Sequence, residues 1–233
     1  MAGNNSGFQR PPRVKTPLDN PKLKLSAPCP VDQSKKSNLV WGIYEGNPRI
    51  SVYIGDPEGK KVEAKIDAVV FESFLQLIEK ATTEVPDWKT HIDNMNYVWF
   101  GGKKSDSPEL VSRLSVGKEK DGHIWISVTD KVAPKVRFFF VNPDMHSFVH
   151  GDGTPYTPGE TSAMFAKSMV DILRRTMNDL FIKAWPEVEA AQKKRNEEMQ
   201  AKRNGGGNSG GNGYNQRVAP PAPMVSSADD FPF

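Results

Sequence analysis

The chain of 233 residues has a single cysteine, Cys29, which lies between Pro28 and Pro30. One cysteine cannot form a disulfide within the chain, so a disulfide-stapled scaffold is excluded and a reducing compartment is expected. We interpret Cys29 as an incidental residue rather than a reactive thiol.

Long hydrophobic runs are missing too. No run approaches the roughly 20 apolar residues of a membrane-spanning helix. The opening residues 1–13 lack the apolar core of a secretion signal. We therefore expect a cytoplasmic protein that has no membrane partner.

Motifs for catalysis or metal binding are scarce. His146 and His150 are four residues apart, but the segment between them lacks the glutamate of a helical zinc-protease motif. Residues 151–153 read as a turn, without the length or the lysine of a phosphate-binding loop. The remaining candidate carboxylates are scattered over predicted loops: Asp106, Glu109, Asp121 and Asp152. We expect no enzyme, no cofactor and no metal site, and we keep a metal-dependent nuclease as the last alternative.

The net charge is only +3, but its distribution is uneven. Residues 1–36 contain two acids, Asp19 and Asp32, whereas the only charged side chains of the last ten residues are acidic. The basic side chains of this first segment are Arg10, Arg13, Lys15, Lys22, Lys24, Lys35 and Lys36. A basic start and an acidic end favour a polyanionic partner, with the tail able to compete for the same surface.

Composition divides the chain into four parts. Residues 1–37 contain six prolines and no sustained periodicity, which predicts a flexible basic arm that either contacts phosphates or only aids solubility. Residues 38–186 form the predicted folded domain. Residues 187–204 are charged and are expected to extend its last helix, and residues 205–233 form a disordered linker rich in Gly and Pro that ends in an acidic tip.

The first half of the domain is predicted as three strands and a helix. Apolar residues alternate with polar ones on both sides of the turn 46–48, which indicates a hairpin, and a third strand is predicted over 61–66. Asp67 follows as the N-cap of a helix, because its carboxylate can accept a hydrogen bond from a free amide of the first turn. The helix is expected to end near Thr82, before Pro86.

The second half is predicted as a loop, four strands and a long helix. The strands are expected over 96–100, around 114–116, over 124–128 and over 136–140, with a tight turn at Asp121-Gly122. Thr157, Pro158 and Glu160 fit a capping box that opens the helix, and Pro186 is expected to interrupt or kink it.

A run of strands followed by a helix is thus predicted twice, with three strands in the first half and four in the second. We predict an α+β fold of antiparallel sheets backed by two helices. This order is similar to the Whirly and transcriptional-coactivator type of single-strand binder. The alternative is an oligonucleotide-binding (OB-fold) barrel over residues 39–130 with an added C-terminal helix.

Alternation along the strands sorts the side chains by face. If Ile50, Val52 and Ile54 face the helices, rings and cations gather on the opposite face: Arg49, Tyr53, Arg113, Trp125, Lys135, Arg137 and Phe139. A base that stacks on a ring contributes ~1–3 kcal/mol without regard to sequence, and cations bind phosphates. The same rings would serve equally to pack against a second sheet or another subunit, and a register error of one residue would invert the assignment.

The chain ends in the residues MVSSADDFPF, which follow a tether rich in glycine. Asp229, Asp230, Phe231, Pro232 and Phe233 make a compact anionic and apolar tip. This ending resembles the acidic tip of bacterial single-stranded-DNA-binding proteins, although the acid run is shorter and Phe231 precedes Pro232. An unfamiliar body with this tip suggests a bacteriophage protein in the cytoplasm of its host.

The resemblance implies a non-enzymatic single-stranded-DNA-binding protein for replication, recombination and repair. Its body would coat exposed strands and self-associate into an oligomer, since single-strand coating by small units is usually multivalent. Its tail would recruit replication and recombination proteins. Two other functions stay open: an adaptor or scaffold that binds a protein through the tail and never touches nucleic acid, and an RNA-binding protein.

Overall fold

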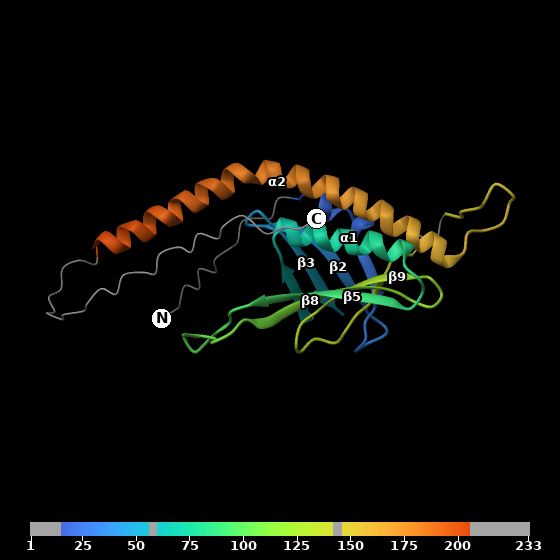
Figure 1. The fold of residues 1–233 in the computed structure, drawn as a ribbon, viewed down its shortest axis with the longest axis horizontal. Coiled ribbons are helices and arrows are strands. Elements are labelled where there is room, and N and C mark those ends of the chain that lie inside the picture. The colour runs from blue at the N-terminus through green and yellow to red at the C-terminus, as the bar shows by residue number, and fades with distance from the viewer. Residues whose placement is uncertain (1–14, 56–59, 142–145, 206–233) are drawn as a thin grey trace, which may run out of the picture. The chain divides into compact units, whose positions relative to one another are not determined.

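The computed structural model describes residues 15–55, 60–141 and 146–205 (Figure 1). The described elements are the short 3₁₀ helices η1 (Pro17–Asp19) and η2 (Pro21–Leu23), the strands β1 (Leu25–Pro28), β2 (Lys36–Tyr44), β3 (Asn47–Ile54) and β4 (Lys60–Lys65), the helix α1 (Ala68–Thr83), the strands β5 (Trp88–Asn96), β6 (Trp99–Phe100), β7 (Lys103–Lys104), β8 (Glu109–Lys118), β9 (Ile124–Thr129) and β10 (Phe138–Phe139), and the helix α2 (Pro158–Gly205).

The strands form two four-stranded antiparallel sheets and a small hairpin. The first sheet has the order β1-β2-β3-β4, and the second has the order β10-β9-β8-β5. In the first sheet Leu39 pairs with Val52, and Val52 pairs with Val62, so all three lie on one face and are fully or nearly fully buried. The hairpin of β6 and β7 continues the β5–β8 pair beyond a β-bulge at Asn94 and Met95.

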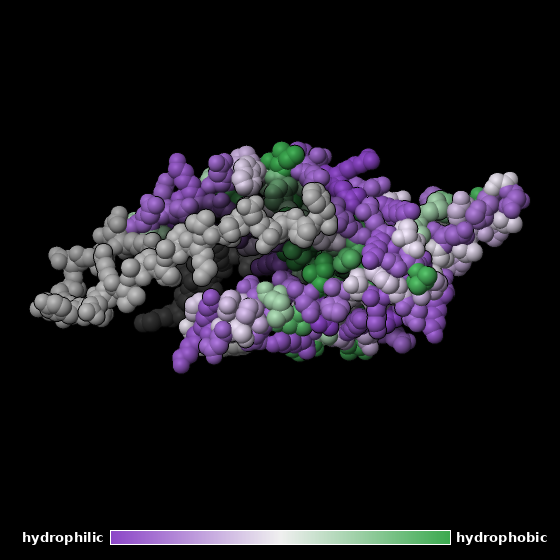
Figure 2. All heavy atoms as spheres, in the orientation of Figure 1, coloured by the Kyte–Doolittle hydropathy of each residue, from purple (hydrophilic) through white to green (hydrophobic). Residues whose placement is uncertain are grey.

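The buried faces of both sheets meet α1 and α2 in one hydrophobic core. Phe74, Leu75 and Ile78 of α1 have no exposed surface, nor do Val170 and Leu173 of α2. In Figure 1, α1 lies between the second sheet and α2. Figure 2 shows hydrophobic residues gathered in a band between the helices and this sheet. The opposite face of the second sheet therefore points away from the helices.

Both predicted helix starts are confirmed. The Asp67 carboxylate accepts a hydrogen bond from the Val70 amide at 2.8 Å. At the start of α2 the Thr157 amide donates to Glu160 Oε2 at 2.8 Å, and the Glu160 amide donates to Thr157 Oγ1 at 3.2 Å. Pro186 lies inside α2, and the helix continues through it.

The body extends to Glu189, and a second unit begins at Ala190. Of this unit the structure describes the helical residues 190–205, and those of 190–201 are exposed. Neither α1 nor α2 contains a stretch of the length and apolarity needed to cross a membrane.

The N-terminal segment differs from the predicted arm. Residues 17–28 form η1, η2 and β1, and β1 pairs with β2. Leu18, Leu23 and Leu25 are buried, and Trp41 Nε1 donates to the Leu23 carbonyl at 2.9 Å. The alternation of Leu23, Leu25 and Ala27 has period two, but the prolines around it hide the pattern. Residues 1–14 lie outside the described residues.

Three strand predictions need correction. Of the strand predicted over 96–100, residue 96 ends β5 and only residues 99–100 form a separate strand, β6. Residues 88–96, expected as part of a loop, form the edge strand β5, whose inward positions are only partly buried and include just one aliphatic residue, Ile92. The strand predicted over 136–140 is only two residues long, although Val136, Phe138 and Phe140 are buried as expected.

The predicted fold class is confirmed at the level of an α+β fold with antiparallel sheets and two α-helices. The described strands close into no barrel, which is against the OB-fold alternative.

Candidate functional site

The seven predicted site residues fall on two different sheets. Arg49 and Tyr53 lie on β3 of the first sheet. The others lie on or beside the strands of the second sheet: Arg113, Trp125, Lys135, Arg137 and Phe139. None of the contacts described below joins the two groups, so we treat them as two surfaces.

Trp125 is the centre of the outward side of the second sheet. It pairs with Gly117 on β8, and a Cβ atom placed on Gly117 would clash with the indole ring. The ring therefore lies close against the backbone of the neighbouring strand at a position where a larger residue would clash with it. Lys135 Nζ lies 5.1 Å and Arg137 Cζ 4.8 Å from the ring centroid. These two cations cover the ring, which is only 3% exposed although it is not part of the hydrophobic core.

Two further cations, Lys89 and Arg113, lie near enough to Lys135 to affect its charge. Burial lowers the pKa of Lys135, and so do the charges of Arg137, Lys89 and Arg113, in that order of effect, while Glu119 opposes them. Among the described residues no carboxylate forms an ion pair with Lys135. We call Lys89, Arg113, Trp125, Lys135, Arg137 and Phe139 the second-sheet face. Its centre is a cluster of positive charge, which favours an anionic ligand.

Carboxylates already bind the two arginines of this face. Arg113 Nε and Nη2 donate to the two oxygens of Asp93 at 2.5 and 2.8 Å, and this pairing lowers the pKa of Asp93. Arg137 Nη1 donates to Glu119 Oε1 at 2.5 Å. All four side chains are partly exposed, so a phosphate can compete for the guanidinium groups at modest cost.

Phe139 lies at one edge of this face. It pairs with Trp125 across β10 and β9, and its ring meets the His123 ring edge-on at 6.1 Å between centroids. Together with Arg137 and Val141 it lines an open hollow of about 650 Å³. Such a hollow is large enough for a nucleotide-sized ligand.

The outward side of the first sheet has the same kinds of residue. Arg49 Cζ lies 5.1 Å and Lys65 Nζ 5.0 Å from the centroid of the Tyr44 ring, and Lys61 Nζ lies 5.3 Å from that of Tyr53. Glu63 forms ion pairs with Arg49 and Lys61. We call Tyr44, Arg49, Tyr53, Lys61 and Lys65 the first-sheet face.

Sequence reasoning missed Tyr44, Lys61, Lys65 and Lys89. The hairpin register could have identified two of them, because Arg49 pairs with Lys65 and Tyr53 pairs with Lys61. Lys89 was missed because β5 was not predicted.

Four of the side chains considered for catalysis have structural partners. Glu109 binds Lys131 at 2.6 Å, and Asp121 lies 2.8 Å from His123. The His150 ring stacks on Tyr156 at 3.9 Å. Asp152 accepts hydrogen bonds within its own turn. No three His, Cys, Asp or Glu side chains of the described segments are grouped so that they could hold a metal ion.

The predicted protein-interaction residues, Asp229 to Phe233, lie outside the described residues. Comparison of the chain with protein-family models, with curated proteins and with solved structures gave no match.

Proposed function

We propose that this chain is a single-stranded-DNA-binding protein that coats exposed strands during replication, recombination and repair. The observation that carries the proposal is the second-sheet face, where Lys135 and Arg137 lie on the ring of Trp125 with Lys89 and Arg113 nearby. Rings among cations that outnumber the neighbouring carboxylates suit a strand whose bases and phosphates are both accessible.

Binding would proceed by an exchange of partners. Lys135 and Arg137 would leave the Trp125 ring to contact phosphates, and the uncovered ring would accept a base. One base–aromatic stack contributes ~1–3 kcal/mol, which is comparable to the two cation–π contacts of ~0.5–2 kcal/mol each that are lost, and the contacts of the freed cations with phosphates add to binding. Phe139, half-buried beside the open hollow, would take a neighbouring base.

The arrangement of two antiparallel sheets with helices behind them supports a Whirly-like or coactivator-like mode of binding. In that mode the strand runs over the outward sides of the sheets. The first-sheet face, with Arg49 and Tyr53, would be a separate contact of the same kind for a longer strand.

The tail would recruit replication and recombination proteins. A partner with a basic rim and an apolar pocket would bind Asp229 and Asp230 through its cations and bury Phe233. Coating by a protein of this size also favours self-association.

Fluorescence anisotropy with labelled oligonucleotides of one length tests the function. We expect micromolar or tighter binding of single-stranded DNA, weaker binding of the duplex, and a loss of affinity as salt rises. A matched RNA strand used as competitor separates a DNA-binding from an RNA-binding protein. No binding of any strand at low salt would contradict the proposal and favour an adaptor that binds only proteins.

A further inference from the structure

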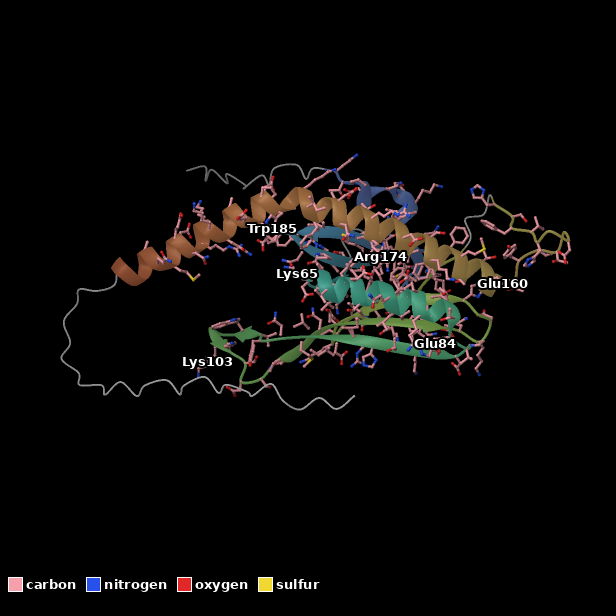
Figure 3. All side chains as sticks on the ribbon, turned by 45° about the horizontal axis from the view of Figure 1, so that its top comes forward. Lys65, Glu84, Lys103, Glu160, Arg174 and Trp185 are labelled. Atoms are coloured by element: carbon pink, nitrogen blue, oxygen red, sulfur yellow. The ribbon has the colours of Figure 1, made fainter. Side chains whose placement is uncertain are left out.

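The hairpin of β6 and β7 presents rings and lysines that neither face includes. Its strands are joined by Gly101 and Gly102, whose positive φ angles of 54° and 82° let the chain reverse in two residues. The base of the hairpin is fixed, because the Ser105 amide donates to the Val98 carbonyl at 2.8 Å and the Val98 amide donates to Ser105 Oγ at 3.1 Å. Figure 3 shows Lys103 at the end of the hairpin, away from α1.

Large side chains are exposed at alternate positions along this segment. Met95 is 51%, Tyr97 42% and Trp99 69% exposed. Trp99 is the most exposed of the five tryptophans in the chain. Large apolar side chains that are exposed near one another along a segment often mark a binding site, whereas single ones scattered over a surface need no explanation.

Positive charge accompanies the rings. Lys104 pairs with Trp99 in the hairpin register, and its Nζ lies 3.8 Å from the centroid of the Tyr97 ring. Lys103 is exposed beside it. Residues 95–105 contain no acid. The hairpin therefore combines aromatic rings and cations, as the second-sheet face does.

We infer that this hairpin is a second contact for the single strand, with a base stacked on Trp99 and phosphates bound by Lys103 and Lys104. This inference rests on the function proposed above. Nucleic acid is favoured over an apolar partner, because lysines flank the rings, and because β5 joins the hairpin directly to Lys89 of the second-sheet face.

The register of β8 gives the distance that a DNA strand must span between the second-sheet face and the hairpin. On β8, Gly117 pairs with Trp125 and Glu109 pairs with Asn96, next to the hairpin. Eight residues of strand span roughly 26 Å, which at 3.4 Å per stacked nucleotide corresponds to roughly eight nucleotides. A strand of about 20 nucleotides would reach both contacts, whereas a four-nucleotide strand with stacked bases would reach only one.

The test compares Trp99→Ala with Trp185→Ala in the full-length protein. Trp185, labelled in Figure 3, is 52% exposed on α2 and serves as the matched control. Anisotropy is measured with a 20-nucleotide thymidine strand, and a four-nucleotide strand is measured by competition. We expect Trp99→Ala to weaken binding of the long strand by about fivefold or more, with the short strand and the control unchanged. Thermal melting confirms that both variants fold.

The outcomes separate the hairpin from the proposed function. If the wild type binds the long strand and Trp99→Ala binds it equally well, only the hairpin contact is overturned. An equal loss for the short and long strands would overturn its role as a second contact. A Trp99→Ala variant that loses only self-association, or only binding to anionic phospholipid vesicles, would also overturn it. If the wild type binds neither strand, the proposed function itself fails.

Discussion

Two buried serines at the second sheet differ in their hydrogen bonding, and only one of them stabilises the sheet. The Ser162 hydroxyl on α2 accepts a hydrogen bond from the Ile124 amide at 2.9 Å, which ties the helix to β9. Ser127, on the same strand as Ile124, is fully buried, and its Oγ has no hydrogen-bond partner among the described residues. A buried donor left without a partner costs about 1–3 kcal/mol.

These two serines should respond in opposite ways to the same substitution. Ser162→Ala should lower the free energy of unfolding by about 1–3 kcal/mol, because the Ile124 amide then stays buried without an acceptor. Ser127→Ala should leave it unchanged or raise it by up to ~1 kcal/mol, because no bond is lost. Urea denaturation measures both. Equal destabilisation by the two substitutions would contradict this account of the sheet.

Lys135 should make DNA binding depend on pH in the alkaline range. Burial and the neighbouring cations hold its pKa below the ordinary 10.5, whereas a bound phosphate would raise the pKa again. At pH values between the pKa of Lys135 in the free protein and its pKa in the complex, the complex binds more protons than the free protein. Affinity should therefore fall as the pH rises through this interval. In Lys135→Arg the charge persists, since a guanidinium stays protonated in this range. Anisotropy titrations from about pH 8 to 10 should therefore show a decline for the wild type and a flatter profile for the variant; identical profiles would exclude a phosphate at Lys135.

At the scale of elements, the two helices are joined by one arginine. Arg174 on α2 donates from Nε to Glu72 at 2.9 Å and from Nη1 and Nη2 to Glu79 at 3.1 and 3.0 Å, and both acids lie on α1. Glu79 and Glu72 raise the pKa of Arg174 above its ordinary value. Figure 3 shows Arg174 where α2 passes α1.

Arg174→Ala should lower the free energy of unfolding by about 1–2 kcal/mol, since the charged hydrogen bonds are partly exposed to solvent. The exposed neighbour Arg175 gives the control, because Arg175→Ala should change stability by less than about 0.5 kcal/mol. The difference should shrink at high salt, which screens the ion pairs. Chemical denaturation at two salt concentrations checks this, and equal effects of the two substitutions would show that Arg174 does not join the helices.

The elements that the sequence predicts well are those with local signals. Asp67 and the capping box at Thr157 define helix starts by hydrogen bonds within one turn, and the alternation around residues 46–48 defines a hairpin. The edge strand β5 could not be predicted, because Trp88, Thr90 and Ile92 are only partly buried and alternate with polar residues that give little hydrophobic contrast. Residues 17–28 were missed because their burial depends on distant partners such as Trp41.

The candidate site, too, could be predicted from the sequence only in part. Alternation correctly placed Lys135, Arg137 and Phe139 outside the hydrophobic core. It could not predict that the glycine at position 117 lets the Trp125 ring approach the backbone, or that two cations cover the ring, because these contacts depend on the tertiary structure. It also could not separate Arg49 and Tyr53 from the other five, since sheet membership depends on tertiary pairing.

At the scale of the whole molecule, the proposal assigns DNA binding to the body and partner recruitment to the tail. Deleting residues 226–233 should leave single-strand affinity intact or tighten it, because an anionic segment that competes with DNA is removed. Anisotropy with the truncated chain measures this, with a deletion in the glycine-rich stretch of 205–213 as a control that keeps the acids. Loss of DNA binding on truncation would show that the tail is part of the binding site.

The most direct test of the central claim is the salt dependence of single-strand affinity in Lys135→Ala/Arg137→Ala. A control with the same loss of charge, Lys167→Ala/Lys183→Ala, removes two exposed lysines from α2. If the second-sheet face binds phosphates through both cations, the slope of log K against log salt should become less steep by about 1.4, and the control should keep the wild-type slope. Equal slopes for the wild type and both variants would contradict the claim that this face binds the strand.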